Sequence, residues 1–149
     1  MPLARLISRS ADGYLYIALP LLLMALQLDP DSQFLLLLPI GLGFERPCYW
    51  ILKNTLRRDR PQQSIPGFCS LIVAADQFSF PSGHTSGAFL LTTSLCLVFG
   101  GPCAAMLLWA LAVAFSRIVL GVHYPGDTLA GAVMGSSCAV LAALLMGVI

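Results

Sequence analysis

Charged residues are scarce in this chain of 149 residues, of which 10% are Asp, Glu, Lys or Arg. Soluble domains carry roughly 25% charged residues, so the composition is typical of a membrane protein instead. The net charge is +1, and the chain has neither a basic arm nor a stretch that interleaves aromatic and basic residues. Binding to nucleic acid, which depends on clustered positive charge, is therefore not predicted.

The sequence also lacks the residue groupings that hold structural metals or disulfide frameworks. It has two histidines and no CxxC pair, so neither a metal cage nor a redox pair is expected. Five cysteines, most of them in apolar runs, are predicted to be small residues buried in lipid or in the protein core: Cys48, Cys69, Cys96, Cys103 and Cys138.

Long apolar runs dominate the chain, which is 58% hydrophobic with a mean hydropathy of +0.85. A helix needs roughly 20 apolar residues to cross a bilayer, and polar turns divide the chain into five segments near that length. We therefore predict a single domain, residues 1–149, that forms an all-α integral-membrane helical bundle. Its spans are expected at 14–28, 34–52, 85–99, 103–120 and 127–149. The first run lacks a convincing small-residue cleavage site and is predicted to be a retained span, not a signal peptide.

Polar and small residues inside these runs mark places where helices meet or end. Glu45 and Arg46 interrupt the second run, and ionisable residues at such depth usually face a bundle interior or the interface. They either mark the point where this helix leaves the hydrocarbon, or Glu45 pairs with a nearby arginine in a supporting role. Gly131 and Gly135 have the GxxxG spacing that permits close helix approach. We predict that they pack inside the bundle, with a homo-oligomer interface as the alternative.

An odd number of spans places the polar segments of interest at one end of the bundle. The N-terminus, the connection 53–82 and the turn 121–126 share that end, whereas the turns at 29–33 and 100–102 lie at the other. A polar connection this long is usually functional or disordered in a compact chain. This distribution is what an active site at a membrane surface requires.

The stretch Phe80-Pro81-Ser82-Gly83-His84 lies where the long connection meets the third apolar run. Pro81 and Ser82 are typical of a helix start, and Gly83 allows close approach to the backbone. A helix N-terminus offers free N–H groups and a positive dipole, which favour an anion such as phosphate. His84 is expected in the first turn beside that anion. Taken alone, the stretch is equally compatible with an ordinary capped helix that carries a surface histidine.

A second cluster lies at the start of the same connection. Lys53, the only lysine of the chain, is followed seven residues later by Arg60 and Pro61. If the second helix continues past Lys53, residues 53, 57 and 60 share one helical face. A basic collar at a helix end is the alternative explanation.

A third cluster consists of Ser116-Arg117, His123 and, four residues later, Asp127, which is near enough to hydrogen-bond an imidazole. The three clusters together supply three cations, a helix N-terminus, two imidazoles and a carboxylate. Phosphoryl transfer needs little more than cations and N–H groups for the oxygens, a nucleophile and an acid for the leaving group. An imidazole such as His123 can be that nucleophile when a third group orients it, and His84 can protonate the leaving oxygen.

In order and spacing, the three clusters resemble the signature of the type-2 phosphatidic acid phosphatase superfamily. This superfamily also includes bacterial polyprenyl-diphosphate phosphatases, glucose-6-phosphatase and vanadium haloperoxidases. Its pattern is a lysine, six residues and Arg-Pro; then Pro-Ser-Gly-His; then Ser-Arg, five residues, a histidine, and an aspartate four residues on. Every position of that pattern is filled between residues 53 and 127. Membrane members usually have six spans, and the five predicted here depart from that scaffold.

The resemblance implies an all-helical bundle, no metal ion and no other cofactor. By position in the signature, it implies that phosphate is bound by Lys53, Arg60, Ser82, Gly83 and Arg117. It further implies that His123 is the nucleophile, Asp127 its orienting partner and His84 the general acid.

The resulting prediction is an integral-membrane phosphatase that acts on a lipid phosphate or diphosphate in the bilayer through a phosphohistidine. Undecaprenyl diphosphate is the favoured substrate, and phosphatidic acid or phosphatidylglycerophosphate are alternatives. A lipid phosphotransferase with the same phosphohistidine is a second enzyme hypothesis. A non-catalytic binder of phosphate head groups is the hypothesis from another class, but a binder needs no general acid such as His84.

The protein is expected in a bacterial inner membrane as a multi-pass protein, and two arguments disagree about the side that carries the site. Arg5, Arg9, Arg57 and Arg58 lie at the same end as the site, and the positive-inside rule would place them in the cytoplasm. The resemblance implies the outer face for most lipid-processing members. We adopt the outer face as the prediction.

Overall fold

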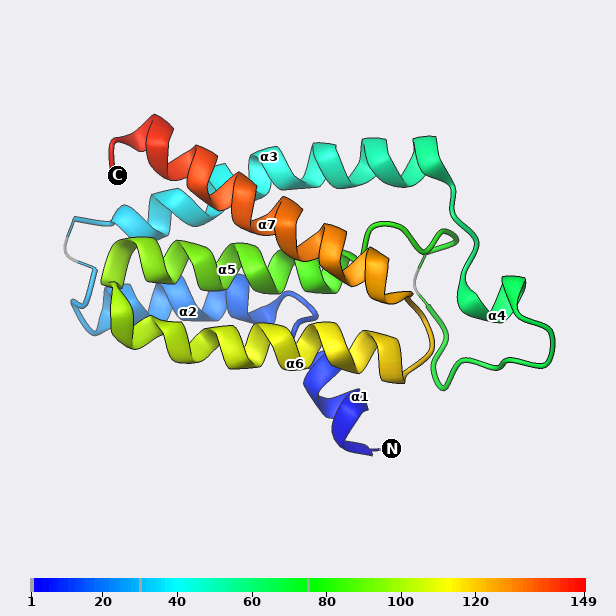
Figure 1. Cartoon of the computed structure of the whole chain (residues 1–149). Helices are drawn as coiled ribbons and strands as arrows, with labels where there is room; N and C mark the ends of the chain where they lie inside the picture. Colours follow the sequence, from blue (N-terminus) through cyan, green and yellow to red (C-terminus); the bar gives the residue numbers. More distant parts are fainter. Residues whose placement is uncertain (1, 30, 75) are drawn as a thin grey trace.

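The computed structural model describes residues 2–29, 31–74 and 76–149, and every regular element within these ranges is a helix (Figure 1). The helices are α1 (Pro2–Arg9), α2 (Tyr14–Ala25), α3 (Gln33–Leu56), α4 (Pro61–Ser64), α5 (Gly83–Phe99), the 3₁₀-helix η1 (Gly101–Ala105), α6 (Met106–Val119) and α7 (Pro125–Met146). The all-α prediction is confirmed.

Five of these helices, α2, α3, α5, α6 and α7, correspond to the five predicted spans. Helix α7 and the segment Gln33–Ser64, which contains α3, are long and apolar enough to cross a membrane. Helices α2 and α5 and the segment Cys103–Val119 are shorter apolar helices. The largest difference from the predicted bounds is in α3, which continues beyond residue 52 to Leu56.

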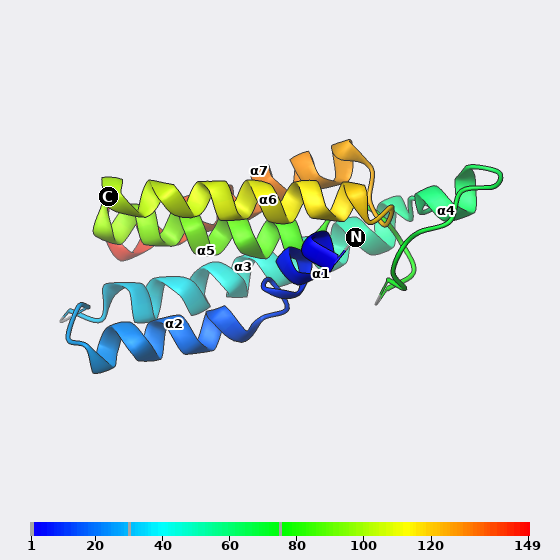
Figure 2. The same ribbon diagram turned by 90° about the horizontal axis from the view of Figure 1, so that it is seen from below.

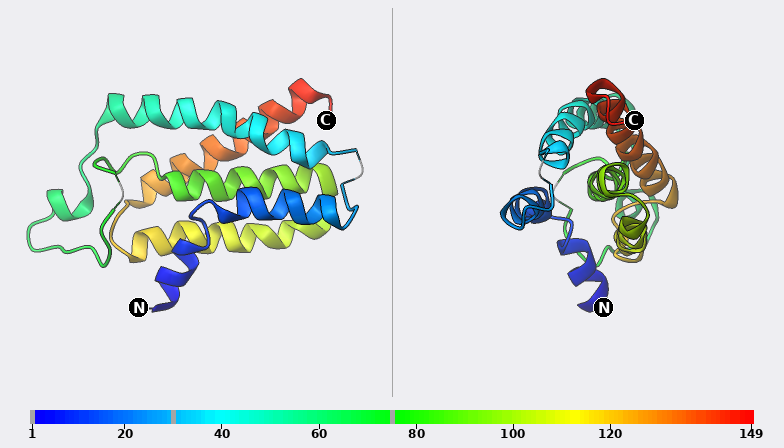
Figure 3. Two further views of the ribbon diagram at one scale, coloured as in Figure 1. Left: turned by 180° about the vertical axis from the view of Figure 1, so that it is seen from behind. Right: turned by 90° about the vertical axis from the view of Figure 1, so that its left-hand side faces the viewer.

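Helix α5 is the central element, and α3, α6 and α7 all pack against it. Figure 2 shows α2 beside α3 on one side of the bundle and α6 on the other, and the end-on view of Figure 3 shows α5 enclosed by its neighbours. Apolar side chains of three helices form the main core: Phe34 and Leu38 of α3, Leu90, Leu91 and Leu95 of α5, and Cys138 and Ala139 of α7.

The GxxxG pair of α7 lies directly against α5. A Cβ atom on Gly131 would stand 2.5 Å from the carbonyl oxygen of Ser82, and one on Gly135 would stand 2.0 Å from that of Ser86. Only glycine permits this backbone approach, which also lets the N–H of Ser82 donate to the carbonyl of Asp127 at 3.0 Å. Packing inside the bundle, as predicted, is confirmed for the glycine pair, and it holds the first turns of α5 and α7 side by side.

The polar residues inside α3 form an ion pair between a buried carboxylate, Glu45, and an exposed guanidinium, Arg46. The Glu45 carboxylate, which is fully buried, accepts hydrogen bonds from the Arg46 guanidinium and from Ser86 Oγ of α5, the latter at 2.6 Å. A buried charge requires such partners. The predicted pairing of Glu45 with an arginine is confirmed, and helix α3 continues through this point.

The polar segments gather at one end of the bundle, as predicted. Arg60 in the long connection donates to the carbonyl of Val122 in the α6–α7 turn at 2.6 Å, and Arg5 of α1 donates to the carbonyl of Leu71 at 2.8 Å. The turn at 29–32, of which Pro30 lies outside the described residues, is at the opposite end (Figure 1).

Candidate active site

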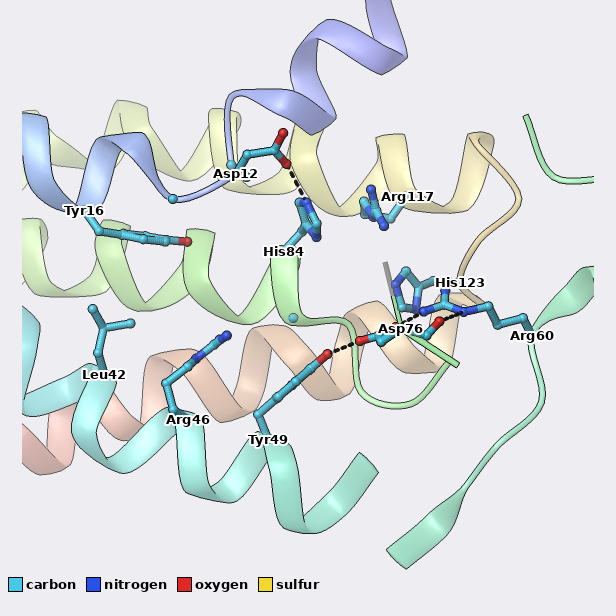
Figure 4. A pocket seen from close by; sticks show the side chains of 13 residues that line it. Asp12, Tyr16, Leu42, Arg46, Tyr49, Arg60, Asp76, His84, Arg117 and His123 are labelled. Atoms are coloured by element: carbon cyan, nitrogen blue, oxygen red, sulfur yellow. Dashed lines mark hydrogen bonds and ion pairs between the residues drawn. The ribbon is translucent and has the colours of Figure 1, made fainter. Parts of the chain in front are cut away.

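A cavity of about 530 Å³ opens at this polar end of the bundle (Figure 4). Five of the predicted site residues line it: Arg60, Gly83, His84, Arg117 and His123. The other three, Lys53, Ser82 and Asp127, lie behind the lining residues and contact them or adjoin them in the chain. The structure therefore brings together three sequence clusters that span residues 53 to 127.

His123 lies in the turn between α6 and α7, and its imidazole faces the first turn of α7. Asp127 Oδ2 accepts a hydrogen bond from the backbone N–H of Tyr124 at 2.8 Å, which fixes the carboxylate at the start of α7. His123 Nδ1 is 3.7 Å from the same oxygen. This separation is beyond hydrogen-bond length, but it is short enough for the carboxylate to orient the ring and to stabilise its positive charge.

The environment of His123 favours a neutral imidazole. Burial lowers the pKa of His123 to about 4; the Asp127 carboxylate opposes this shift, and the nearby Arg60 and Arg117 cations add to it. His123 is 4% exposed, so its ring has little water to solvate a charge. At neutral pH the imidazole keeps a free lone pair, which a nucleophile requires.

Arg58 supports the Asp127 carboxylate from the other side. Its Nη1 donates to Asp127 Oδ1 at 2.9 Å, and its guanidinium lies over the Tyr124 ring, 4.1 Å from the centroid. Asp127 is fully buried, so this partner offsets the cost of its charge. Arg58 belongs to the polar connection, but no motif position identified it.

Lys53 and Arg60 converge on the carboxylate of Asp76. Lys53 Nζ donates to Asp76 Oδ2 at 2.7 Å, and the Arg60 guanidinium and the Tyr49 hydroxyl also donate to this carboxylate (Figure 4). Burial alone raises the pKa of Asp76, but the hydrogen bonds from Lys53 and Tyr49 and the charge of Arg60 bring it down to about 2. Two of the predicted phosphate ligands, Lys53 and Arg60, therefore already bind an anionic group, the Asp76 carboxylate of the same chain.

The prediction that residues 53, 57 and 60 share a helical face is wrong. Helix α3 ends at Leu56, and Arg57 adopts the left-handed conformation with φ 45°. The chain then turns, and Arg60 stands at the start of the short helix α4. Lys53 and Arg60 meet because both reach Asp76, not because they lie on one helix.

Arg117 enters the cavity from α6 and is held by the N-terminal helix. Its Nη1 donates to Ser8 Oγ of α1 at 2.6 Å. Within the described residues, Arg117 Nε and His123 Nδ1 are buried without a hydrogen-bond partner. Buried polar atoms of this kind are uncommon because they cost free energy, and both belong to residues that line the cavity. Arg117 Nε is suited to donate to an anion in the cavity, whereas His123 Nδ1 faces the Asp127 carboxylate at 3.7 Å.

The start of α5 is built as predicted, with one difference. His84 lies in the first turn, and Gly83 lies so close to the Tyr49 ring that a Cβ atom there would be 2.9 Å from it. Ser82 is the N-cap residue by position, but its hydroxyl is paired with Thr85 Oγ1 at 3.0 Å and makes no capping bond to the backbone.

Several contacts of the site come from residues that no motif identified: Ser8, Asp12, Tyr49, Arg58 and Asp76. Arg58 and Asp76 are charged residues of the polar connection, so their charge and location could have identified them as site candidates. Ser8, Asp12 and Tyr49 lie outside the motifs and carry no spacing pattern.

A second cavity, of about 640 Å³, adjoins the first and shares Asp12, His84 and Arg117 with it. Its remaining lining includes two arginines and several neutral polar residues: Arg5, Ser8, Arg9, Gln62 and Ser70. The first cavity, in contrast, also reaches Tyr16 of α2 and Leu42 of α3 inside the bundle.

Comparison with known proteins gives a consistent result. The model of the PAP2 superfamily matches residues 34–148. "Probable lipid phosphate phosphatase beta" of Arabidopsis thaliana is 32% identical over 144 residues, which cover 78% of this chain and 67% of the relative. The decaprenylphosphoryl-5-phosphoribose phosphatase of Mycolicibacterium smegmatis is 36% identical over 81 residues, 54% of this chain and 43% of the relative. The chain thus spans less than half of that second protein.

Among solved structures, a transmembrane PAP2-type phosphatidylglycerolphosphate phosphatase from Bacillus subtilis superposes with a TM-score of 0.78 at 25% identity. The superposition covers 99% of this chain and 77% of the Bacillus protein. The transmembrane character of that protein agrees with the apolar helices found here, so the bundle is a membrane-protein fold.

Proposed function

Because the chain belongs to the PAP2 superfamily, we propose that it is a membrane phosphatase that hydrolyses a lipid phosphate through a phosphohistidine. The observation that carries the proposal is the geometry around His123. A buried neutral imidazole stands 3.7 Å from the Asp127 carboxylate and shares a cavity with Arg60 and Arg117. Cations at this position can neutralise the oxygens of a transferring phosphoryl group.

In the first step, the imidazole of His123 attacks phosphorus. Because Nδ1 faces Asp127, Nε2 is the nitrogen that forms the bond to phosphorus while the bond to the leaving oxygen breaks. His84 gives its proton to that oxygen, and Asp127 stabilises the positive charge that develops on His123.

In the second step, water attacks the phosphohistidine. His84, now neutral, takes a proton from that water, the N–P bond breaks, and inorganic phosphate leaves with the nucleophile restored. Lys53, Arg60 and Arg117 hold the phosphoryl oxygens in both steps. The N–H groups at the start of α5 add to this stabilisation, because a helix N-terminus favours negative charge.

The shape of the first cavity supports a lipid substrate. Most of the charged lining residues lie in its outer part, whereas Tyr16 and Leu42, with Arg46 beside them, line its inner part between α2 and α3 (Figure 4). A molecule with an anionic head and an apolar chain is complementary to such a site. Among lipid phosphates we favour a polyprenyl diphosphate such as undecaprenyl diphosphate, and the mycobacterial relative, named for a decaprenylphosphoryl compound, supports a polyprenyl-linked substrate. Phosphatidic acid and phosphatidylglycerophosphate are the second choice.

The first test is a phosphate-release assay with detergent-solubilised protein and a panel of lipid phosphates, with and without EDTA. We expect hydrolysis that is insensitive to EDTA and inhibited by orthovanadate, which imitates the transferring phosphoryl group. A preference for transfer to an alcohol over water would indicate a phosphotransferase instead. Binding without release would indicate a head-group binder. Loss of activity on chelation, with recovery on adding a divalent ion, would contradict the metal-independent mechanism.

Displacement of Asp76 gives a second prediction. If the phosphoryl group replaces the Asp76 carboxylate between Lys53 and Arg60, the neutral variant Asp76→Asn no longer competes with it. Inhibition by orthovanadate should then strengthen about tenfold, which corresponds to ~1.4 kcal/mol. The exposed Asp59 of the same connection offers the matched control Asp59→Asn, for which no change is expected. Weaker inhibition of Asp76→Asn would show instead that Asp76 holds the cations in place for phosphate.

We further propose that the site lies on the outer face of a bacterial inner membrane. The prediction that the cysteines are buried in lipid or in the protein core is wrong for Cys69, which is exposed in the polar connection. A membrane-impermeant maleimide can therefore report its side in intact cells. Labelling should occur without permeabilisation and should disappear in Cys69→Ser. Labelling of Cys69 only after permeabilisation would place the site on the cytoplasmic side, as the positive-inside rule predicts from the arginines at this end of the bundle.

A further inference from the structure

The N-terminal segment reaches the candidate active site although it lies outside residues 34–148, the part that matches the family model. From the loop between α1 and α2, Asp12 Oδ1 lies 2.8 Å from His84 Nε2 (Figure 4). From α1 itself, Ser8 Oγ accepts a hydrogen bond from Arg117 at 2.6 Å. Two residues of one short segment therefore contact two residues of the proposed machinery.

His84 needs an anionic neighbour if it is to act as an acid. It shares its cavity with the guanidinium groups of Arg46, Arg60 and Arg117, and positive charges disfavour the protonation of an imidazole. The Asp76 carboxylate, which lines the same cavity, is engaged by Lys53 and Arg60. The second cavity adds two more cations on the other side, Arg5 and Arg9. Asp12 is the carboxylate that lies within hydrogen-bond distance of the His84 ring.

We propose that Asp12 is a positioning residue that fixes the His84 ring and favours its protonated form, so that the N-terminal segment completes the general acid. This inference rests on the proposed phosphatase function. Because Asp12 binds Nε2, Nδ1 is the nitrogen that donates the proton to the leaving oxygen. His84 then returns to the neutral ring, which keeps its hydrogen bond from Nε2–H to the carboxylate.

The proposal has a kinetic signature that a merely structural role lacks. An acid is needed most when the leaving oxygen is a poor leaving group, as in a lipid monoester, and least for an activated aryl phosphate. Asp12→Asn should lower kcat for the lipid substrate about tenfold to a hundredfold, less than the loss of the acid itself, and should leave KM nearly unchanged. The loss for the aryl phosphate should be clearly smaller. Asp12→Glu, which keeps the carboxylate, should retain more activity than Asp12→Asn.

A double-mutant cycle shows whether Asp12 acts through His84. When His84 is already alanine, adding Asp12→Asn should cause no further loss. The matched control is Asp31→Asn, which changes an exposed aspartate at the opposite end of the bundle. Equal losses of Asp12→Asn on both substrates, or losses that add to those of His84→Ala, would overturn the proposal and reduce Asp12 to a residue that holds the α1–α2 loop.

Failure of this inference is distinguishable from failure of the proposed function. If the wild-type protein releases no phosphate from any lipid phosphate or aryl phosphate, the proposed function fails before any variant is compared. If the wild type is active and Asp12→Glu is no better than Asp12→Asn, the inference alone fails. Thermal unfolding of each variant in detergent verifies that the compared proteins are folded.

Discussion

Replacement of His123 by alanine is expected to reduce turnover to background on every substrate. In the proposed mechanism the imidazole of His123 forms the covalent bond to phosphorus, so its removal takes away that nucleophile. The loss should be the same for a lipid phosphate and for an activated aryl phosphate, because neither can form the intermediate. Rapid acid quenching with labelled substrate measures this directly, since wild type should carry labelled phosphate and His123→Ala should carry none.

The outcome that would contradict this assignment is equally direct. Labelled phosphate on the His123→Ala protein would make His84 the nucleophile and would reverse the two roles. The variant Asp127→Asn should have a partial effect. Its amide keeps the His123 ring near its place but no longer stabilises the positive charge that develops on the ring. Its activity should fall between wild type and His123→Ala. Since Asp127 also binds Arg58, its folding must be verified by thermal unfolding.

The same histidine is expected to determine how activity responds to low pH. The pKa of His123 is lowered to about 4 by burial, so its neutral form persists at every pH above that value. The nucleophile is lost only when the pH falls through about 4. We therefore expect kcat/KM to remain free of a His123-dependent decline between pH 7 and pH 5. A decline centred near the unperturbed histidine value of about 6.5 would contradict the buried, neutral state of this ring.

The helical elements were predictable because each apolar run is long and is separated from the next by polar or glycine- and proline-containing turns. The start of α5 followed from Pro81 and Ser82, and the close packing of α7 followed from the spacing of Gly131 and Gly135. The end of α3 was not predictable in the same way. Arg57 adopts a positive φ, a conformation that glycine or asparagine would have indicated but that arginine does not. The helix therefore ends before residue 57, and residues 53, 57 and 60 do not share a helical face.

The residues of the candidate site were predictable where a spaced motif contains them. They were not predictable where a distant segment contributes one side chain that contacts a motif residue. Arg58 reaches Asp127 across 69 residues, and Asp12 reaches His84 across 72. Such pairs leave no periodic pattern, since one partner of each pair, Arg58 or Asp12, is a single side chain from a loop. Asp76 belongs to the same class: its charge was visible in the polar connection, but its place between Lys53 and Arg60 depends on the path of a loop without regular structure.

Replacement of His84 by alanine should cost about 10²–10⁴-fold in turnover, which is the usual contribution of a general acid. In contrast to His123, the defect should depend on the leaving group. An aryl phosphate hardly needs protonation, so its hydrolysis should recover most of the loss, and a diphosphate should recover more than a monoester. His84→Ala should also still form the phosphohistidine from an activated substrate, because His123 and the cations remain in place. Rates for a graded series of leaving groups, measured in wild type and His84→Ala, provide the comparison. Equal losses along that series would show that His84 does not donate the proton, and the acid would then have to be sought among the other groups that line the cavity.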